Sequence, residues 1–283
     1  MKKNCKYTQN IESYDGTQLS VEILDQGHLD WLILTHGIGE HSGRHQYIYD
    51  LLKEHYNICL YDLRGHGHSG GERGSVKKFS QFRRDLQSLL IYLRNSHEVN
   101  SFSLFGHSMG GLILCDFMQS KLYTKVNIPI KSVFLSSPAI GVAGSLGRFL
   151  NFLPFKIHQA LSGAPVSFSM QGLNDYSYLS HDSKTAELYE KDNLVLKEFS
   201  SSLLLKLVKT AKKISSRNLN SPCPVYCSVG SSDQIVDYDK ICSYLESQDD
   251  TYINRIEGGF HELHNETSEY RDLHINFIKM SLI

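Results

Sequence analysis

The serine at residue 108 lies in a sequence context that could make it a nucleophile. The segment GHSMG, residues 106–110, fits the pattern Gly-x-Ser-x-Gly around Ser108. Where this pattern carries a reactive serine, a strand runs into a sharp turn and a helix begins directly after it. The apolar run SFSLF precedes the turn, and MGGLILCDFMQSKL continues with a helical pattern. The sequence therefore predicts that Ser108 is held at the tip of a strand–turn–helix.

The same pattern occurs a second time, in GHSGG at residues 67–71 around Ser69. This serine also follows an apolar run, NICLYD. The segment that contains it, RGHGHSGGERGS, is rich in glycine and has no apolar period, which is typical of a loop. We therefore interpret Ser69 as a loop-stabilising hydroxyl and Ser108 as the nucleophile.

A serine hydroxyl is a weak nucleophile unless a base accepts its proton and an acid orients that base. After a strand–turn–helix of this kind the chain order is serine, acid, histidine, with the last two on loops that follow later strands. Asp233 follows the apolar run PVYCSVG, and His261 follows YINRIEG. We therefore predict a catalytic triad of Ser108, Asp233 and His261. Asp237 is better explained as a residue at the start of the next helix.

Two backbone N–H groups are needed to bind the oxyanion that forms when a serine attacks an ester. One comes from the residue after the nucleophile, here Met109. The other comes from the loop after an earlier strand. The run WLILTH is followed by Gly37 and Ile38, so we predict that the N–H of Ile38 is the second donor.

Neither a metal nor a cofactor is expected. The segment HELH at 261–264 lacks the i, i+4 histidine spacing of the zinc-binding HExxH motif. The six cysteines are scattered and form no CxxC pair. Most of them lie in apolar runs, where a thiol packs as a small hydrophobic group. This usage favours reduced, buried thiols in a cytoplasmic protein.

The elements that must position these residues can be read from the apolar pattern. Short apolar, β-branched runs predict strands at 19–24, 31–36, 57–62, 101–106, 130–137, 224–230 and 252–258. From Trp31 onward the runs are almost continuously hydrophobic, as in buried parallel strands. Apolar residues at helical spacing lie between them, for example over 79–93 and 238–245. The alternation predicts an α/β fold with a mostly parallel sheet flanked by helices.

This alternation is interrupted between residues 143 and 220. The interrupting segment has helix-like stretches and no clear strand. We interpret 143–220 as a helical cap or lid inserted over the carboxyl edge of the sheet, with 1–142 and 221–283 forming the core. The Phe- and Leu-rich stretch 146–157 adds the hypothesis of a transient peripheral membrane contact through the cap.

Bulk properties exclude other functional classes. A chain of 283 residues with 41% hydrophobic residues and a net charge of −1 has no electrostatic footprint for nucleic acid. No stretch approaches the ~18 apolar residues of a membrane-spanning helix. The first residues lack the apolar region of a signal peptide. The sequence leaves the oligomeric state open.

With these residues placed, the chain resembles the monoglyceride lipase and lysophospholipase branch of the α/β-hydrolase fold over nearly its whole length. The motifs that carry the resemblance are HGIGEHSGR (36–44), DLRGHGHSGGERG (62–74), GHSMGG (106–111), GSSDQIVD (230–237) and HELHNE (261–266). The resemblance implies an eight-stranded sheet, a helical cap, no metal, and hydrolysis of a fatty acyl ester through an acyl-serine intermediate.

The resemblance also implies substrate contacts. In monoglyceride lipases the Glu and Arg of GEHSGR and the second His of HxxH lie near the glycerol end of the site, which here are Glu40, Arg44 and His264. Tyr189 matches a tyrosine that lies nearby in the family. The alternative is that Glu40 and Arg44 form a salt bridge that fixes their loop. The chain departs from the family at His45, where an aromatic residue is usual, and the cap matches only loosely.

The combined expectation is a serine hydrolase that cleaves monoacylglycerols to glycerol and free fatty acid. One alternative is a lysophospholipase or broad-specificity carboxylesterase, which would use the same residues under a different cap. The second alternative is a non-catalytic α/β-hydrolase homologue that binds a ligand. Dehalogenase or epoxide hydrolase chemistry would require Asp at position 108, so the serine excludes it.

Overall fold

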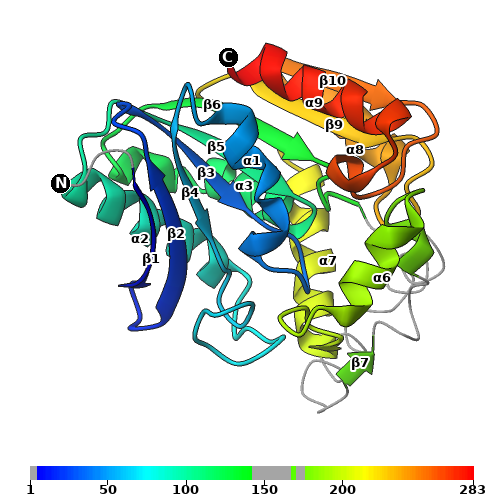
Figure 1. The fold of residues 1–283 in the computed structure, drawn as a ribbon, viewed down its shortest axis with the longest axis horizontal. Coiled ribbons are helices and arrows are strands. Elements are labelled where there is room, and N and C mark those ends of the chain that lie inside the picture. Colours follow the sequence, from blue (N-terminus) through cyan, green and yellow to red (C-terminus); the bar gives the residue numbers. More distant parts are fainter. Residues whose placement is uncertain (1–4, 142–166, 170–175) are drawn as a thin grey trace.

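The computed structural model describes residues 5–141, 167–169 and 176–283, and an eight-stranded sheet forms its centre (Figure 1). The strand order is β1-β2-β4-β3-β5-β6-β9-β10. The pairs β1–β2 and β2–β4 are antiparallel, and the other pairs are parallel. The strands are β1 (Cys5–Glu12), β2 (Gln18–Asp25), β3 (Asp30–Thr35), β4 (Asn57–Tyr61), β5 (Ser101–His107), β6 (Ile130–Ser136), β9 (Val225–Gly230) and β10 (Thr251–Ile256). The predicted α/β fold with a mostly parallel sheet is confirmed.

All seven apolar runs form strands, and the eighth strand, β1, was not predicted from the residues. The inner strands β3 to β6 are buried on both faces, which explains their continuous hydrophobic character. Strand β1 lies at the sheet edge, and its residues alternate between half-buried and exposed along most of its length. A half-solvated edge strand contains many polar residues, so it produces no apolar run.

Helices cover both faces of the sheet. Helices α1 (Tyr47–Leu52) and α9 (Ser268–Leu282) lie on one face, and α2 (Ser80–Ser96), α3 (Met109–Gln119), α7 (Ser201–Ser215) and α8 (Tyr238–Glu246) lie on the other (Figure 1). Neighbouring residues of β5 show the two faces, because Leu104 packs in the core beneath α2 and α3 whereas Phe105 packs with Ile278 of α9. Short 3-10 helices lie at η1 (Ser42–His45), η2 (Leu122–Lys125) and η5 (Leu263–Asn265).

The predicted cap contains η4 (Tyr176–Tyr178), α6 (Ser183–Lys191) and α7, together with two short strands. The expectation of no strand here is wrong, since β7 (Ser167–Ser169) and β8 (Glu198–Ser200) pair antiparallel. The sequence did not predict these two strands because each has only three residues, which is too short for a recognisable apolar pattern. The cap boundaries at 143 and 220 stay a prediction, and the stretch 146–157 lies outside the described residues.

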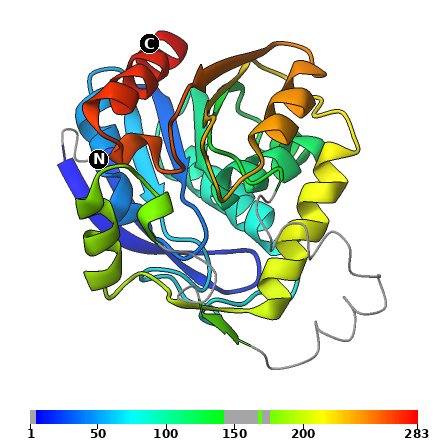
Figure 2. The same ribbon diagram turned by 90° about the vertical axis from the view of Figure 1, so that its right-hand side faces the viewer.

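Helix α7 packs on the core rather than standing over the edge of the sheet. Its apolar side chains, including Leu203 and Ile214, belong to the same cluster as α2 and α3. Near its end, the Gln119 side-chain amide of α3 donates to the carbonyl of Ile214 at 3.0 Å. In Figure 2, α7 is the yellow helix at the right-hand side of the molecule. Within the described part of the chain, no helix is both long and apolar enough to cross a membrane.

Candidate active site

Ser108 occupies the turn between β5 and α3, as the strand–turn–helix pattern predicts. Its φ of 51° lies in a region that residues with a Cβ seldom adopt, which is typical of strained functional turns. A Cβ on Gly110 would lie 2.0 Å from the carbonyl oxygen of Thr35, and one on Gly106 would lie 2.8 Å from the carbonyl carbon of Gly110. Both glycines are therefore required for the close packing that forms the turn.

The structure brings the three predicted triad residues together at the carboxyl ends of their strands. The Ser108 hydroxyl lies 3.0 Å from Nε2 of His261, and Nδ1 of His261 lies 2.7 Å from Oδ2 of Asp233. All three residues are buried, with exposed fractions of 5%, 4% and 8% for Ser108, His261 and Asp233. The arrangement can move a proton from the serine hydroxyl to the imidazole.

Asp233 is oriented by its own loop. Its Oδ1 accepts backbone N–H groups from Ile235 at 2.8 Å and from Val236 at 3.0 Å, which leaves Oδ2 for His261. Burial alone would lower the pKa of His261, but the charge and hydrogen bond of Asp233 outweigh it, and the pKa lies above its ordinary value. His261 is thereby prepared to carry a positive charge after it accepts a proton.

The loop after β3 lies directly against the nucleophile. If Gly37 had a Cβ, that atom would lie 3.1 Å from Cβ of Ser108, so the backbone of Gly37 lies close to the nucleophile. Ile38 is the next residue in this loop. Met109 is the first residue of α3, and the first N–H groups of a helix have no intrahelical partner. Met109 directly follows Ser108, and Ile38 directly follows Gly37, so the role of their N–H groups as oxyanion donors stays a prediction.

Glu40 holds the loop after β3 from within. Its carboxylate accepts the N–H of Gly37 and, at 3.0 Å, Nε2–H of His45. Burial by itself would raise the pKa of Glu40, but the neighbouring His45, through its charge and its hydrogen bond, lowers this pKa well below the ordinary value. A charged, buried Glu40 therefore fixes the backbone on which the predicted oxyanion donor lies.

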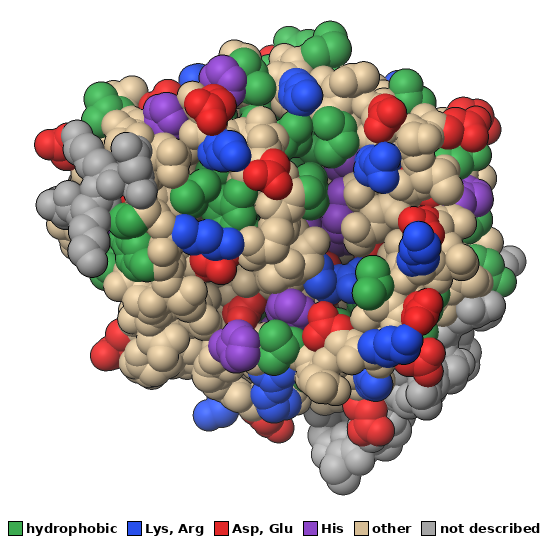
Figure 3. All heavy atoms as spheres, in the orientation of Figure 1, with side chains coloured by type: hydrophobic (Ala, Val, Ile, Leu, Met, Phe, Trp, Pro, Cys, Tyr) green, Lys and Arg blue, Asp and Glu red, His purple; other side chains and the backbone are tan. Residues whose placement is uncertain are grey.

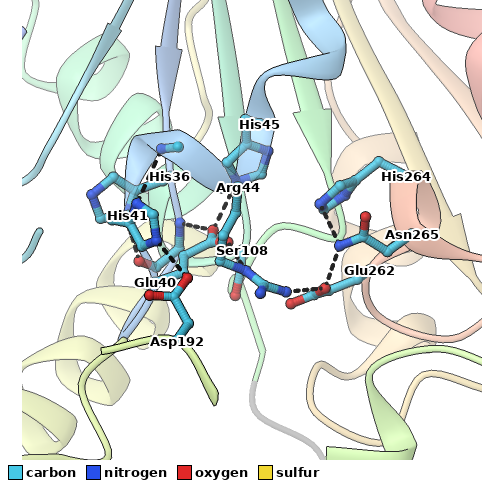
Figure 4. Close-up of polar contacts among 12 residues, drawn as sticks. His36, Glu40, His41, Arg44, His45, Ser108, Asp192, Glu262, His264 and Asn265 are labelled. Carbon is cyan, nitrogen blue, oxygen red and sulfur yellow. Dashed lines mark hydrogen bonds and ion pairs between the residues drawn. The ribbon is translucent and has the colours of Figure 1, made fainter. Parts of the chain in front are cut away.

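Arg44 connects this loop to the loop that carries His261 (Figure 4). Its Nε lies 3.5 Å from Oε2 of Glu40, so the ion pair considered as an alternative role is present. Its Nη2 donates to Glu262 at 2.7 Å, and its guanidinium lies 4.6 Å from the ring centroid of Tyr189. Burial opposes the charge, but Glu262 and Glu40 raise the pKa of Arg44 above its ordinary value. Glu262 was missed by sequence reasoning, and its position beside His261 was the only signal for it.

His264 lies in a cluster of buried rings. Its ring centroid is 4.7 Å from that of His45, 5.0 Å from Tyr47 and 5.3 Å from His107. Burial lowers the pKa of both His107 and His264 well below the ordinary value, so these rings are neutral at neutral pH. The departure from the family at His45 therefore places a fully buried, hydrogen-bonding ring behind Glu40.

One face of the molecule is hollowed. Histidine side chains are visible in a depression of the face drawn in Figure 3. Near the candidate site, Nε2 of His41 lies 2.8 Å from Oδ2 of Asp192, which joins the loop after β3 to the residue after α6 (Figure 4). Tyr189 and Phe199 both contact the position of Gly39. The described part of the predicted cap therefore packs directly on the candidate site.

The hydroxyl of Ser69, the serine that was not assigned as nucleophile, is hydrogen-bonded within its loop and to β2. Its hydroxyl accepts the N–H of Ser20 at 2.9 Å and donates to the carbonyl of Asp62 at 2.6 Å. Asp237 caps α8, since its carboxylate accepts the N–H of Lys240 at 3.1 Å. No disulfide joins any of the six cysteines, all of which lie in the described part of the chain, and five of them are buried. Among the residues that the structure describes, no cluster of His, Cys, Asp and Glu is arranged to hold a metal.

Comparison with known proteins agrees with the family resemblance inferred from the sequence motifs. Residues 28–268 match the family described as serine aminopeptidase, S33. The monoglyceride lipase of Mus musculus is 26% identical over 245 residues, which cover 84% of this chain and 77% of that protein. An uncharacterised abhydrolase domain-containing protein of Dictyostelium discoideum is 27% identical over 244 residues, but the match spans only 24% of that longer protein.

Among solved structures, the monoacylglycerol lipase of Paleococcus ferrophilus superposes with a TM-score of 0.74 at 22% identity. The superposition covers 98% of each chain. This likeness confirms the fold, and the sequence relatives confirm the resemblance inferred from the motifs.

Proposed function

The chain belongs to the serine aminopeptidase, S33 family, and on that premise we propose that it is a carboxylic ester hydrolase that cleaves monoacylglycerols to glycerol and free fatty acid. The observation that carries the proposal is the hydrogen-bonded series from Ser108 through His261 to Asp233. The substrate class is supported by the mouse relative, which is a monoglyceride lipase. The match of the motifs around Glu40 and His264 also supports it.

In the first half of the reaction, Ser108 attacks the ester carbonyl while His261 accepts the hydroxyl proton. The N–H groups of Ile38 and Met109 bind the oxyanion, and each such donor typically contributes about 10²–10³ in turnover. His261 then donates the proton to the glycerol oxygen as the carbon–oxygen bond breaks. The product of this half is an acyl ester on Ser108.

In the second half, water replaces glycerol. His261 accepts a proton from the water as its oxygen attacks the acyl carbonyl, and the same two N–H groups bind the new oxyanion. Collapse of this intermediate returns the proton to the oxygen of Ser108 and releases the fatty acid. Asp233 holds the imidazole in one tautomer throughout and stabilises its positive charge.

Charge near the serine favours an ester over a peptide with a free amino group. An aminopeptidase needs an uncompensated carboxylate for the substrate ammonium. The carboxylate of Glu40 already contacts His45 and Arg44, and that of Glu262 is bonded to Arg44 at 2.7 Å. These two buried acids are therefore compensated by cations or hydrogen-bond donors within the protein.

We extend the proposal to the cap, the cellular location and the partners of the enzyme. Segment 143–220 is the proposed cap, which would cover the acyl chain, with 146–157 as its proposed peripheral membrane contact. Five buried, free thiols support the proposed cytoplasmic location, since disulfides are rare there. A lipid ester is the only partner the proposal requires, with no cofactor and no nucleic acid.

The test is parallel release of fatty acid from mono-oleoylglycerol and from lysophosphatidylcholine. We expect a preference for the monoacylglycerol and no turnover in Ser108→Ala. The matched control is Ser69→Ala, which removes the serine of the second Gly-x-Ser-x-Gly and should retain turnover. Preference for the lysophospholipid would transfer the assignment to that substrate, and cleavage of an aminoacyl anilide alone would overturn the ester assignment.

A further inference from the structure

A buried carboxylate, that of Glu266, joins the His261 loop to the chain just before α6. Glu266 has no solvent exposure. Its Oε1 accepts the N–H of Phe260 at 2.8 Å, and Nδ1 of His181 lies 2.9 Å from the same oxygen. Its Oε2 accepts the N–H of His181 at 2.9 Å. One side chain therefore contacts both the residue before His261 and the predicted cap.

The ring of His181 is also fixed by stacking. Its centroid lies 3.7 Å from that of Phe260, with 26° between the planes, and 4.8 Å from that of Tyr270, with 24° between the planes. About a third of the side chain, 34%, remains exposed. His181 therefore lies between the surface and Glu266, with one face against the residue that precedes the proposed catalytic base.

Further contacts join the same two segments on the far side of His261. The N–H of Glu262 donates to the carbonyl of Leu179 at 2.8 Å, and the Ser180 hydroxyl donates to the carbonyl of Asn265 at 2.8 Å. In the described chain, residues 257–262 form neither helix nor strand. The position of this loop therefore depends on such contacts, which hold it on both sides of His261.

We propose that His181 is a positioning residue for the catalytic base, acting through Glu266. The imidazole orients the carboxylate, the carboxylate holds the N–H of Phe260, and the next residue, His261, is thereby aligned between Ser108 and Asp233. This inference rests on the proposed function, because it assigns a role in the reaction of that site. It also gives the segment before α6 a role in positioning the proposed base, in addition to its place in the predicted cap.

Two substitutions separate the hydrogen bond from the stacking. His181→Phe keeps a flat ring beside Phe260 and Tyr270, but its side chain cannot donate to Glu266, which then accepts only the backbone N–H of this residue. His181→Asn keeps a donor close to the position of Nδ1 but loses the ring. We expect His181→Phe to lose about 10- to 100-fold in kcat with KM little changed, because small misplacements of catalytic groups have effects of this size. We expect His181→Asn to retain most of the wild-type kcat.

A second readout distinguishes positioning from a general loss of stability. If the contact between His261 and Asp233 loosens, the pKa of His261 falls, and the acid limb of kcat/KM in His181→Phe moves to lower pH. A purely structural role would lower the melting temperature and leave kcat and the acid limb unchanged, which would overturn the proposal. Equal losses of kcat in both variants would also overturn it, because stacking would then be the cause.

The matched control is His55→Phe, at an exposed histidine that follows α1 and lies outside the site. It should leave kcat and the acid limb unchanged. Glu266→Gln provides an independent variant, which should reproduce the loss of kcat in His181→Phe. Wild-type protein without esterase activity would mean that the proposed function fails, whereas an active wild type with an unaffected His181→Phe would mean that only this inference fails.

Discussion

Substitution of Glu262 by Gln should destabilise the protein because it removes one partner from a buried ion pair. The side chains of Arg44 and Glu262 are only 9% and 3% exposed, and they meet at 2.7 Å. Gln preserves the size of the side chain and a hydrogen-bonding oxygen, so packing is nearly unchanged. What the variant removes is the negative charge that compensates the guanidinium.

The expected cost follows from the burial of the pair. Loss of one partner of a buried pair typically costs about 3–5 kcal/mol, since the remaining charge is left uncompensated. Here Glu40 remains 3.5 Å from Arg44 and compensates part of this charge, so we expect a value near the lower limit, about 3 kcal/mol. Arg44→Met should also lose the guanidinium contact with Tyr189, which contributes about 1 kcal/mol.

The free energy of unfolding can be measured by urea titration, provided that the transition is two-state. The control is Glu187→Gln, which removes the acid of an exposed pair with Lys191. Those side chains are 61% and 71% exposed, so the expected cost is below ~1 kcal/mol. The double variant Arg44→Met/Glu262→Gln should be more stable than the sum of the single effects, with a coupling above ~1 kcal/mol.

A cost for Glu262→Gln as small as that for Glu187→Gln would refute the reasoning. It would mean that Arg44 reaches water or another partner once Glu262 is neutral. Additive single effects in the double variant would refute it independently, because they would show that the two side chains do not interact energetically.

Five further predictions concern the proposed triad and the turn and loops around it. The acid limb of kcat/KM should lie above pH 6.5, because the base must be neutral and Asp233 raises the pKa of His261 above that value; a limb below it would contradict the assignment. Because this pKa is raised in the folded state, the contribution of protonated His261 to the free energy of unfolding should be lost as pH rises through its folded pKa, while activity rises. Asp233→Asn should lower turnover by about 10⁴. Ser69→Ala should lose about 1–2 kcal/mol in urea titrations while fatty-acid release persists, because its two hydrogen bonds serve only the fold. Gly110→Ala should yield little folded protein by circular dichroism, since its Cβ would lie 2.0 Å from a carbonyl oxygen; normal folding would show that the turn can relax.

Seven strands of the sheet, and the meeting of Ser108, Asp233 and His261, could be predicted because their signals are local. The inner parallel strands β3 to β6 are buried over almost their whole length and are therefore mainly apolar, and the turn at Ser108 needs glycines at fixed positions. The order of Asp233 and His261 follows from the order of the strands that precede them. Each of these residues can therefore be identified from a pattern that lies within a few positions of it in the chain.

The contacts around the site were not predictable in this way. Whether Arg44 pairs with Glu40, with Glu262 or with substrate depends on how two loops more than 200 residues apart approach each other. The same holds for Glu266 and His181, whose pairing requires the folded position of the predicted cap. The core packing of α7 was missed because an amphipathic helix shows which face is buried and leaves its partner open.

The central claim is that Ser108 is the nucleophile, and covalent labelling tests it most directly. The protein would be treated with a fluorophosphonate, digested, and the modified peptide sequenced by mass spectrometry. We expect one adduct, on Ser108, with labelling abolished in Ser108→Ala and greatly slowed in His261→Ala. An adduct on Ser69, or an unmodified Ser108 in folded protein that still hydrolyses mono-oleoylglycerol, would contradict the account.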